Sequence, residues 1–259
     1  IGSVKLGIAL VNYDPHDRAS YDMCFISHYR PELFSHDVAP LFKKIEFHHR
    51  SLFKKVIDYV ITRNLSLVIL SRTRQTSMQI TERTYFTDIA GTVSFDFIRA
   101  DKGANEFNTY FAGLSSDLIV HPASTLGFEL FAAGKKVLFG ASQDPDFVRE
   151  WGIESYFDAL PGIVKLETDS NDEFYQTCDF LRQMPTTLFQ EKTQNAAKTI
   201  VSMPEEEYHY MIFTVPICTG IDAITLLIVV AGTKVPRKLI NLFVSAYPFI
   251  NIEIAGPIA

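Results

Sequence analysis

The residues best suited to chemistry in this 259-residue chain lie together in "HPASTLGFE", residues 121 to 129. A strand-like run, "DLIVH", ends at His121, and a helix-like run begins at about Ser124. A parallel strand that leads into a helix places the helix's unpaired amides at the ligand-side edge of the sheet, where the helix dipole favours anions. The hydroxyls of Ser124 and Thr125 would lie beside those amides. The pattern predicts a site for a monophosphate or a diphosphate.

A simpler interpretation of the same residues stays open. Ser124 or Thr125 can be an ordinary N-cap, which stabilises a helix by about 1 kcal/mol, and His121 can be a hydrogen-bonded histidine near the surface. Glu129 favours a ligand site, because a carboxylate among apolar helix residues needs a partner such as a ribose hydroxyl or an arginine. The alternative for Glu129 is a solvated position on an exposed face.

Basic residues also follow the other strand-like segments. Arg30 lies in "SHYRPE", Arg72 lies in "SRTRQ", and Arg99 follows "FDFI". Because the ends of parallel strands meet at one edge of a sheet, these guanidinium groups and His121 predict a local anion site. For Arg30 the alternative is a solvated loop arginine.

Three side chains, those of His28, His121 and Asp22, could transfer protons. None of them is assigned as the catalytic base. The "HHR" run at residues 48 to 50 is not typical of a metal site, since adjacent helix residues point in different directions. We expect that run to be solvated. The three cysteines are far apart and lack metal or disulfide spacing, which predicts reduced, buried thiols.

Several common catalytic motifs are missing from the sequence. The chain contains no GxGxxG, GxxxxGK[ST], GxSxG or HExxH pattern. These absences weigh against a dinucleotide dehydrogenase, a P-loop NTPase, an α/β-hydrolase and a zinc protease.

The elements that must position these residues alternate between strand-like and helix-like patterns. The predicted strands are 22–27, 65–71, 93–98, 117–121, 135–140 and 162–166, and the predicted helices are 40–63, 105–114, 124–133, 171–183 and 188–201. A further loop and helix are expected after residue 71. This order predicts an α/β fold, a doubly wound Rossmann-like parallel sheet that binds ligands beyond the carboxyl ends of its strands.

Past "MPEEEY" (residues 203–208) the chain contains few charged residues. This change in composition predicts a boundary near residue 204 and two domains, 1–204 and 205–259. Residues 223–256 read as strand, glycine turn, helix and strand. Such a βαβ segment is too small to bury its own faces, and it could form part of a second Rossmann-like domain.

Composition sets limits on the partners. The chain is 47% hydrophobic and 21% charged, as is typical of globular proteins, and its formal net charge is −6. That charge gives no general reason to bind nucleic acid. The apolar run 211–232 is long enough to span a membrane if tilted, but Pro216, Gly220 and Asp222 interrupt it.

The order "FISHYRPE", long helix, "LSLVILSRTRQ", "FDFIRA" and "SSDLIVHPASTLGFELFAAGKKVLF" resembles the nucleotide-sugar-binding Rossmann domain of GT-B glycosyltransferases. The likeness is strongest to bacterial surface-carbohydrate and capsule biosynthesis transferases. It covers about residues 20 to 200, and its most specific part is "DLIVHPASTLGFELFAAGKKVLF". The resemblance implies that Ser124 and Thr125 hold the donor phosphate, and that Glu129 contacts the ribose or base region.

The same resemblance extends to other site residues. Arg30 and Arg72 resemble the basic residues at the interdomain cleft of these enzymes. His121 and Pro122 resemble the HP element of bacterial sialyltransferases and Kdo transferases, which use CMP-sugars, although here the pair lies unusually near the Ser-Thr pair. A GT-B enzyme needs two Rossmann domains, so an acceptor domain either precedes Ile1 or follows the donor domain, and the catalytic residue stays unknown.

The resemblance implies a metal-independent glycosyltransferase, or its donor-binding portion. It would move a sugar from a CMP- or UDP-linked donor to a surface glycan acceptor, without a cofactor. We expect a cytoplasmic protein, either free or at the inner face of the membrane, with a membrane or partner contact through 205–259. Two alternatives stay open: a GT-B-shaped nucleotide-sugar epimerase, and a noncatalytic Rossmann-like module that docks a partner through its apolar tail.

Overall fold

The structure is a computed structural model of the whole chain. It describes residues 4–29, 40–71, 73, 76–99, 107–140, 148–149, 157–200, 210–219, 222–230 and 251–255. The chain divides into two compact units, Ser3–Ser202 and Met203–Ala259. This division, between Ser202 and Met203, is close to the domain boundary that the sequence predicts near residue 204.

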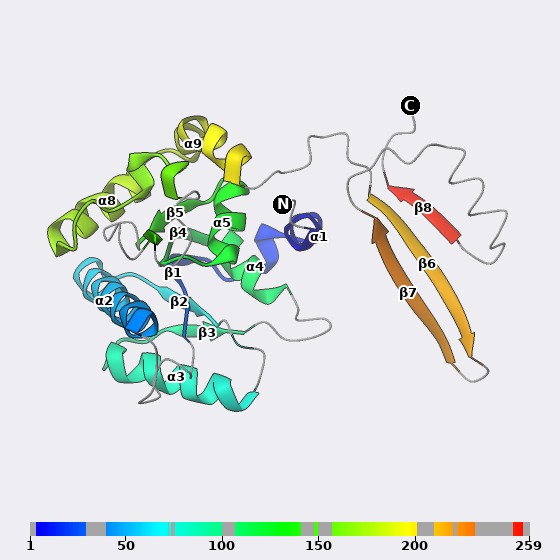
Figure 1. Cartoon of the computed structure of the whole chain (residues 1–259), viewed down its shortest axis with the longest axis horizontal. Helices are drawn as coiled ribbons and strands as arrows, with labels where there is room; N and C mark the ends of the chain where they lie inside the picture. Colours follow the sequence, from blue (N-terminus) through cyan, green and yellow to red (C-terminus); the bar gives the residue numbers. More distant parts are fainter. Residues whose placement is uncertain are drawn as a thin grey trace. The chain divides into compact units, whose positions relative to one another are not determined.

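The first unit alternates strands and helices along the chain (Figure 1). Its described elements are α1 (Val4–Val11), the 3-10 turn η1 (Pro15–Asp17), β1 (Tyr21–Ile26), α2 (Pro40–Arg63), β2 (Leu67–Leu70), α3 (Thr76–Ala90), β3 (Asp96–Ile98), α4 (Asn108–Leu114), β4 (Ser116–His121), α5 (Thr125–Ala132), β5 (Lys136–Phe139), the 3-10 turn η4 (Gly162–Val164), α8 (Asn171–Gln183) and α9 (Thr186–Ile200). Apart from α1 and the last short strand, this is the order that the sequence predicts.

The five strands of this unit form one parallel sheet in the order β3-β2-β1-β4-β5. At its centre, Cys24 of β1 lies opposite Val68 of β2 and Ile119 of β4. The strand order reverses between β1 and β4, as it does in a doubly wound Rossmann sheet, where that reversal creates a ligand-binding crevice. The predicted fold class is therefore confirmed.

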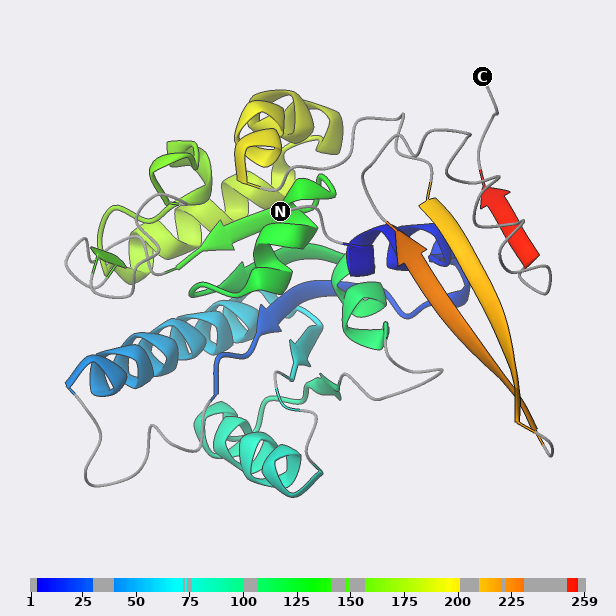
Figure 2. The ribbon, with the colours of Figure 1, turned by 45° about the vertical axis from the view of Figure 1, so that its right-hand side comes forward.

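Helices cover both faces of this sheet, because right-handed crossovers change face where the strand order reverses. Helices α2 and α8 pack against β1, β4 and β5 on one face, with α3 beside α2. Helices α4 and α5 pack on the other face, with α1 beside α4 and α9 beside α5. Figure 1 shows α2 and α4 on opposite sides of the strands, and Figure 2 shows the same arrangement after a turn of 45°.

The strands are buried on both faces, and apolar runs supply their side chains. All four residues of β2 are buried, as expected of a central parallel strand. Between the helices that cover one face of the sheet, Phe53 of α2 packs edge to face against Phe86 of α3, with ring centroids 4.7 Å apart. One stripe of apolar residues on α2 is buried, namely Leu52, Phe53, Val56, Ile57 and Val60, whereas Ile61 is 60% exposed.

One predicted strand is absent from the first unit. Gly162–Val164 form the 3-10 turn η4, and a single parallel bridge from Phe139 to Lys165 replaces the expected pairing. Pro161 precedes the turn in an extended conformation, with φ −68° and ψ 148°, and the 3-10 turn begins at Gly162. So short an apolar run does not separate a strand from a turn by its pattern alone.

The second unit is a three-stranded antiparallel sheet of β6 (Tyr210–Thr219), β7 (Asp222–Val230) and β8 (Asn251–Ala255). Its strand order is β7-β6-β8. The two strands of the expected βαβ segment correspond to β7 and β8, and the expected helix between them lies outside the described residues. The sequence did not predict β6. The βαβ prediction for this segment is therefore wrong, because β6 lies between the two expected strands and pairs with both in an antiparallel sheet.

The apolar run 211–232, considered above as a membrane helix, supplies β6 and β7. Across the described residues, no helix combines the length and the apolar character needed to cross a bilayer.

A reciprocal clamp joins β1 and β2 at the amino edge of the parallel sheet. The Asp22 amide donates to Ser66 Oγ at 2.9 Å, and the Ser66 amide and hydroxyl donate to Asp22 Oδ2 at 2.9 and 2.7 Å. Arg182 Nη2 reaches Asp22 Oδ1 at 3.2 Å. Burial alone would raise the pKa of Asp22, but the Ser66 hydrogen bonds and the Arg182 charge outweigh it, so that pKa is lowered.

This clamp gives stability a defined pH dependence. A lowered carboxyl pKa in the folded state stabilises the protein above the unfolded pKa, and the gain is lost as the pH falls through the folded value. Asp22→Asn should therefore cost about 1 kcal/mol near neutral pH, after allowance for solvent screening of this partly exposed pair. The cost should begin to fall near the ordinary aspartate pKa of about 3.9 and continue to fall as the pH passes through the lowered pKa of folded Asp22. Urea unfolding from pH 7 to pH 2.5 measures it; Asp88→Asn, at an exposed position on α3, is the control. A cost that does not change with pH would contradict this account.

Candidate functional site

The candidate site lies at the point where the strand order reverses, at the carboxyl ends of β1 and β4. Ligands of open α/β sheets bind in this crevice. Strand β1 runs out here into Ser27, His28 and Tyr29, and β4 delivers the chain from His121 to the start of α5. The described residues of the predicted anion site thus lie at the expected edge of the sheet.

The start of α5 is not closed by a side chain. Ser124 is the N-cap, with φ −98° and ψ 137°, yet its hydroxyl makes no capping hydrogen bond. The first intrahelical bond runs from the Phe128 amide to the Ser124 carbonyl at 3.2 Å. The amides of Thr125, Leu126 and Gly127 therefore have no partner within the helix. With Thr125 exposed, this helix start retains donors that could bind an anion.

His121 instead binds the backbone just before the helix. The Ser124 amide donates to His121 Nδ1 at 2.8 Å. His121 is fully buried, and this burial lowers its pKa to about 3, so the imidazole is neutral at physiological pH. Since Nδ1 accepts, the ring proton resides on Nε2. The prediction that His121 faces the ligand is corrected: the strand ends as expected, but the ring points into the core and shapes the helix start.

Gly127 allows this contact between His121 and α5. A Cβ atom at Gly127 would lie 2.2 Å from His121 Nε2 and 2.4 Å from two ring carbons. Among the residues that the structure describes, none hydrogen-bonds to the buried Nε2 atom. The ring also packs on Phe139, at 4.6 Å between centroids. This close contact joins the end of β4 to the first turn of α5, next to the helix amides that lack helical partners.

Glu129 has the partner that its apolar surroundings require, and the partner is a tyrosine. Tyr110 Oη of α4 donates to Glu129 Oε2 at 2.6 Å. Glu129 is only half-buried. Pro122, by contrast, is buried, so its contribution to the site is to shape the backbone after β4. Nothing in the sequence pattern identifies Tyr110 as the partner of Glu129.

A buried histidine holds the chain on the β1 side of the site. The His28 amide donates to His49 Nε2 at 3.2 Å, and Tyr85 Oη lies 3.4 Å from His49 Nδ1. Burial lowers the pKa of His49 to about 3. The expectation that "HHR" is solvated is wrong for His49, which is buried on the sheet side of α2. Its spacing of four residues from both Ile45 and Phe53 is the signal that could have revealed this.

Further polar contacts fix the ends of β2 and β3. Ser71 Oγ donates to Glu82 Oε2 at 2.6 Å, and Glu82 is fully buried. Arg99 Nη1 donates to Gln79 Oε1 at 3.0 Å. Arg99 thus lies at the predicted edge, oriented by α3. No sequence signal pointed to Glu82, because α3 has only a weak apolar stripe.

The remaining predicted residues lie elsewhere. Arg30 and Arg72 are outside the described residues. Asp22, considered above for proton transfer, belongs to the clamp at the amino edge and so is on the wrong side of the sheet for this site. Over the ranges that the structure describes, no three His, Cys, Asp or Glu side chains are grouped as metal ligands.

Comparison with solved structures gives only remote similarity. A "putative UDP-N-acetylglucosamine 2-epimerase" from Listeria monocytogenes has a TM-score of 0.41 and 15% identity, covering 76% of this chain and 46% of that one. The UDP-GlcNAc 2-epimerase from Neisseria meningitidis bound to UDP-GlcNAc has a TM-score of 0.42 and 15% identity, covering 76% and 50%. The chain thus spans about half the length of each.

Comparison by sequence is more informative. No curated protein matches the chain. The sequence model of a family described as "putative O-antigen biosynthesis protein" matches residues 3–214, which includes every described element of the Rossmann unit. Because the match spans most of the chain, this protein belongs to that O-antigen biosynthesis family.

Proposed function

We propose that this chain is the donor-binding unit of a glycosyltransferase, which transfers a sugar from a nucleotide-sugar to a surface glycan acceptor. The observation that carries the proposal is the open start of α5 at the reversal point of the sheet. There, the Ser124 hydroxyl makes no capping bond and Thr125 is exposed, beside amides without helical partners. Membership of an O-antigen biosynthesis family supports a sugar-building role.

Glycosyl transfer needs the donor's phosphate as a leaving group. When the bond between the sugar carbon and the phosphate oxygen breaks, negative charge grows on the phosphate. Fixed amides and a helix dipole directed at that charge stabilise it more in the transition state than in the bound donor. The amides of α5 and the hydroxyls of Ser124 and Thr125 would perform this task. Arg30 and Arg72 remain part of the proposal as additional phosphate ligands in a metal-independent reaction.

Glu129 would bind the ribose of the donor. A carboxylate can accept hydrogen bonds at both oxygens, and Tyr110 occupies Oε2. Tyr110 therefore fixes the carboxylate orientation and leaves Oε1 for a ribose hydroxyl. His121 and Pro122 would act indirectly, by holding the backbone that leads into α5. The catalytic base is not assigned, because neutral, buried His121 is unsuited to that role.

A transfer assay on the full chain tests this function. The protein is incubated with CMP-, UDP- or GDP-linked sugars and a surface-glycan acceptor, and products are separated by mass. The proposal predicts an acceptor extended by one sugar and an equal amount of released nucleotide. Conversion of the donor into a sugar isomer without acceptor would contradict it in favour of an epimerase. Absence of any nucleotide binding would contradict it in favour of a docking module.

A further inference from the structure

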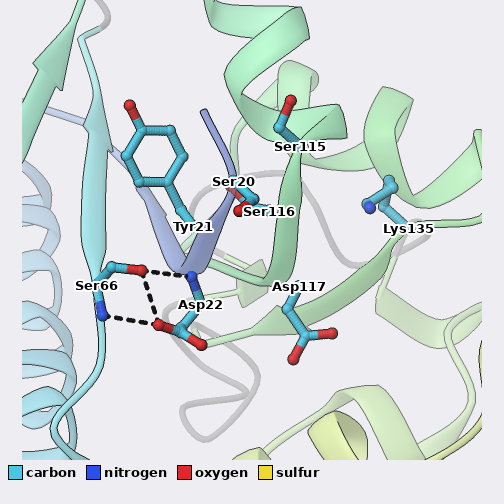
Figure 3. Close-up of a pocket in the computed structure, with 8 residues that line it drawn as sticks. All are labelled: Ser20, Tyr21, Asp22, Ser66, Ser115, Ser116, Asp117 and Lys135. Atoms are coloured by element: carbon cyan, nitrogen blue, oxygen red, sulfur yellow. Dashed lines mark hydrogen bonds between the residues drawn. The ribbon is translucent and has the colours of Figure 1, made fainter. Parts of the chain in front are cut away.

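A polar pocket lies at the amino edge of the parallel sheet, the edge opposite the proposed donor site. It has a volume of about 360 Å³ and is lined by four serines together with Tyr21, Asp22, Asp117 and Lys135 (Figure 3). The pocket forms where β1, β2, β4 and β5 begin. Its lining is rich in hydroxyl and carboxylate oxygens.

Most polar groups of this pocket already have partners. Asp22 is bound by Ser66 and Arg182, as described above. Asp117 accepts from Arg182 Nε at 3.3 Å and lies 3.6 Å from Lys136 Nζ. Lys135 differs, because its ammonium makes no hydrogen bond or ion pair with any described residue, and no dashed line reaches it in Figure 3. One half-buried amine thus faces the pocket with no fixed partner in the described part of the chain.

The charges around Lys135 affect how readily it loses its proton. Burial lowers the pKa of Lys135, and the neighbouring Lys136 lowers it further, whereas the Asp117 carboxylate acts against both. Other ionisable groups on the adjoining strands and helix include Tyr21, Asp22, Arg182 and the buried thiol of Cys24, which acts to raise the pKa of Lys135. More of this amine is therefore neutral near pH 7 than is usual for an exposed lysine, and only the neutral amine is nucleophilic.

We propose that Lys135 is a nucleophilic amine that captures small hydroxylated aldehydes in this pocket as an imine. In this step a bond forms between Nζ and the carbonyl carbon, the carbon–oxygen bond breaks, and the oxygen leaves as water with the two amine hydrogens. No oxidant or reductant is required. The lining determines the class of ligand, because Asp22 and Asp117 disfavour an anionic electrophile and can accept hydrogen bonds from hydroxyls.

Reductive trapping on the full chain tests the proposal. The protein is incubated with glyceraldehyde and cyanoborohydride at pH 7, and modification at each lysine is followed by peptide mass spectrometry. Lys135 should be modified measurably faster than exposed Lys54 and Lys192, because its lowered pKa leaves more of the amine neutral at pH 7. The ratio should stay nearly constant until the pH approaches the ordinary lysine pKa of about 10.4, and it should shrink above that pH. Equal or slower modification of Lys135 at pH 7 would overturn the proposal.

Two variants and a second aldehyde separate a pocket effect from general reactivity. Lys136→Met should slow trapping at Lys135, and Asp117→Asn should accelerate it, because the two charges act on the amine in opposite directions. Propanal, which has no hydroxyl groups, should modify Lys135 less than glyceraldehyde does. Unchanged rates in both folded variants, or equal modification by propanal, would refute the proposal. Ser124 and Thr125 are untouched, so this outcome is independent of the proposed transferase function.

Discussion

Gly127→Val should lower the free energy of unfolding by about 3 kcal/mol, since overpacking a filled core costs about 1–3 kcal/mol and often more for a branched side chain. The added Cβ would lie 2.2 Å from His121 Nε2. The imidazole cannot easily turn away, because Nδ1 holds the Ser124 amide and the ring packs on Phe139. Either the helix moves off the strand or the hydrogen bond from the Ser124 amide to His121 Nδ1 breaks. Urea unfolding of the full chain measures the loss.

Two controls isolate the contact between Gly127 and His121. Gly162→Ala should change stability by less than about 0.5 kcal/mol, because nothing lies within 4 Å of a Cβ at that position. His121→Ala combined with Gly127→Ala should be less destabilising than the two single changes added together, since removal of the ring creates space for the methyl group. Additive costs would show that the two residues do not constrain each other.

The double variant Ser124→Ala/Thr125→Ala should weaken nucleotide binding by about tenfold to hundredfold. A hydrogen bond to a charged group contributes about 1.5–3 kcal/mol, and each 1.4 kcal/mol is tenfold in affinity. The folded state should lose little, because the Ser124 hydroxyl makes no capping bond. Isothermal titration with UDP, CMP and GDP gives the affinity, and thermal unfolding gives the stability.

Ser170 provides a matched control, because it is an N-cap whose hydroxyl accepts from the Glu173 amide at 3.0 Å. Ser170→Ala should cost about 1 kcal/mol of stability and leave nucleotide binding unchanged. Ser124→Ala should show the reverse. If both variants lose stability alike and neither loses binding, then Ser124 only terminates a helix.

The sequence was sufficient to predict the Rossmann unit because its signals are local. Alternating apolar runs and short connections predict strands and crossover helices, and α2 begins and ends where its pattern indicates, at Pro40 and Arg63. The missed elements lack such signals. Helix α1 is a short apolar run, and β6 contains Pro216 and reads as part of a longer apolar segment.

The candidate site was predictable in its position and less so in its contacts. Ser124, Thr125 and Glu129 lie where a strand leads into a helix, and that juxtaposition is visible in the sequence. The inward turn of His121 was not, because it depends on space that Gly127 leaves on the facing helix turn. The partnership of Glu129 with Tyr110 joins two helices, so spacing along the chain could not reveal it.

The central claim is that main-chain amides at the start of α5 bind the donor's phosphate. Thr125→Pro tests it most directly, because Thr125 is the first helical residue, where proline is well tolerated, and Ser124 has the extended backbone that precedes a proline. Compared with Thr125→Ala, which removes only the hydroxyl, Thr125→Pro also removes one amide hydrogen. Calorimetric titration with the best-binding nucleotide should show about tenfold weaker binding for Thr125→Pro than for Thr125→Ala, at equal thermal stability. Equal affinities of the two folded variants would contradict the claim.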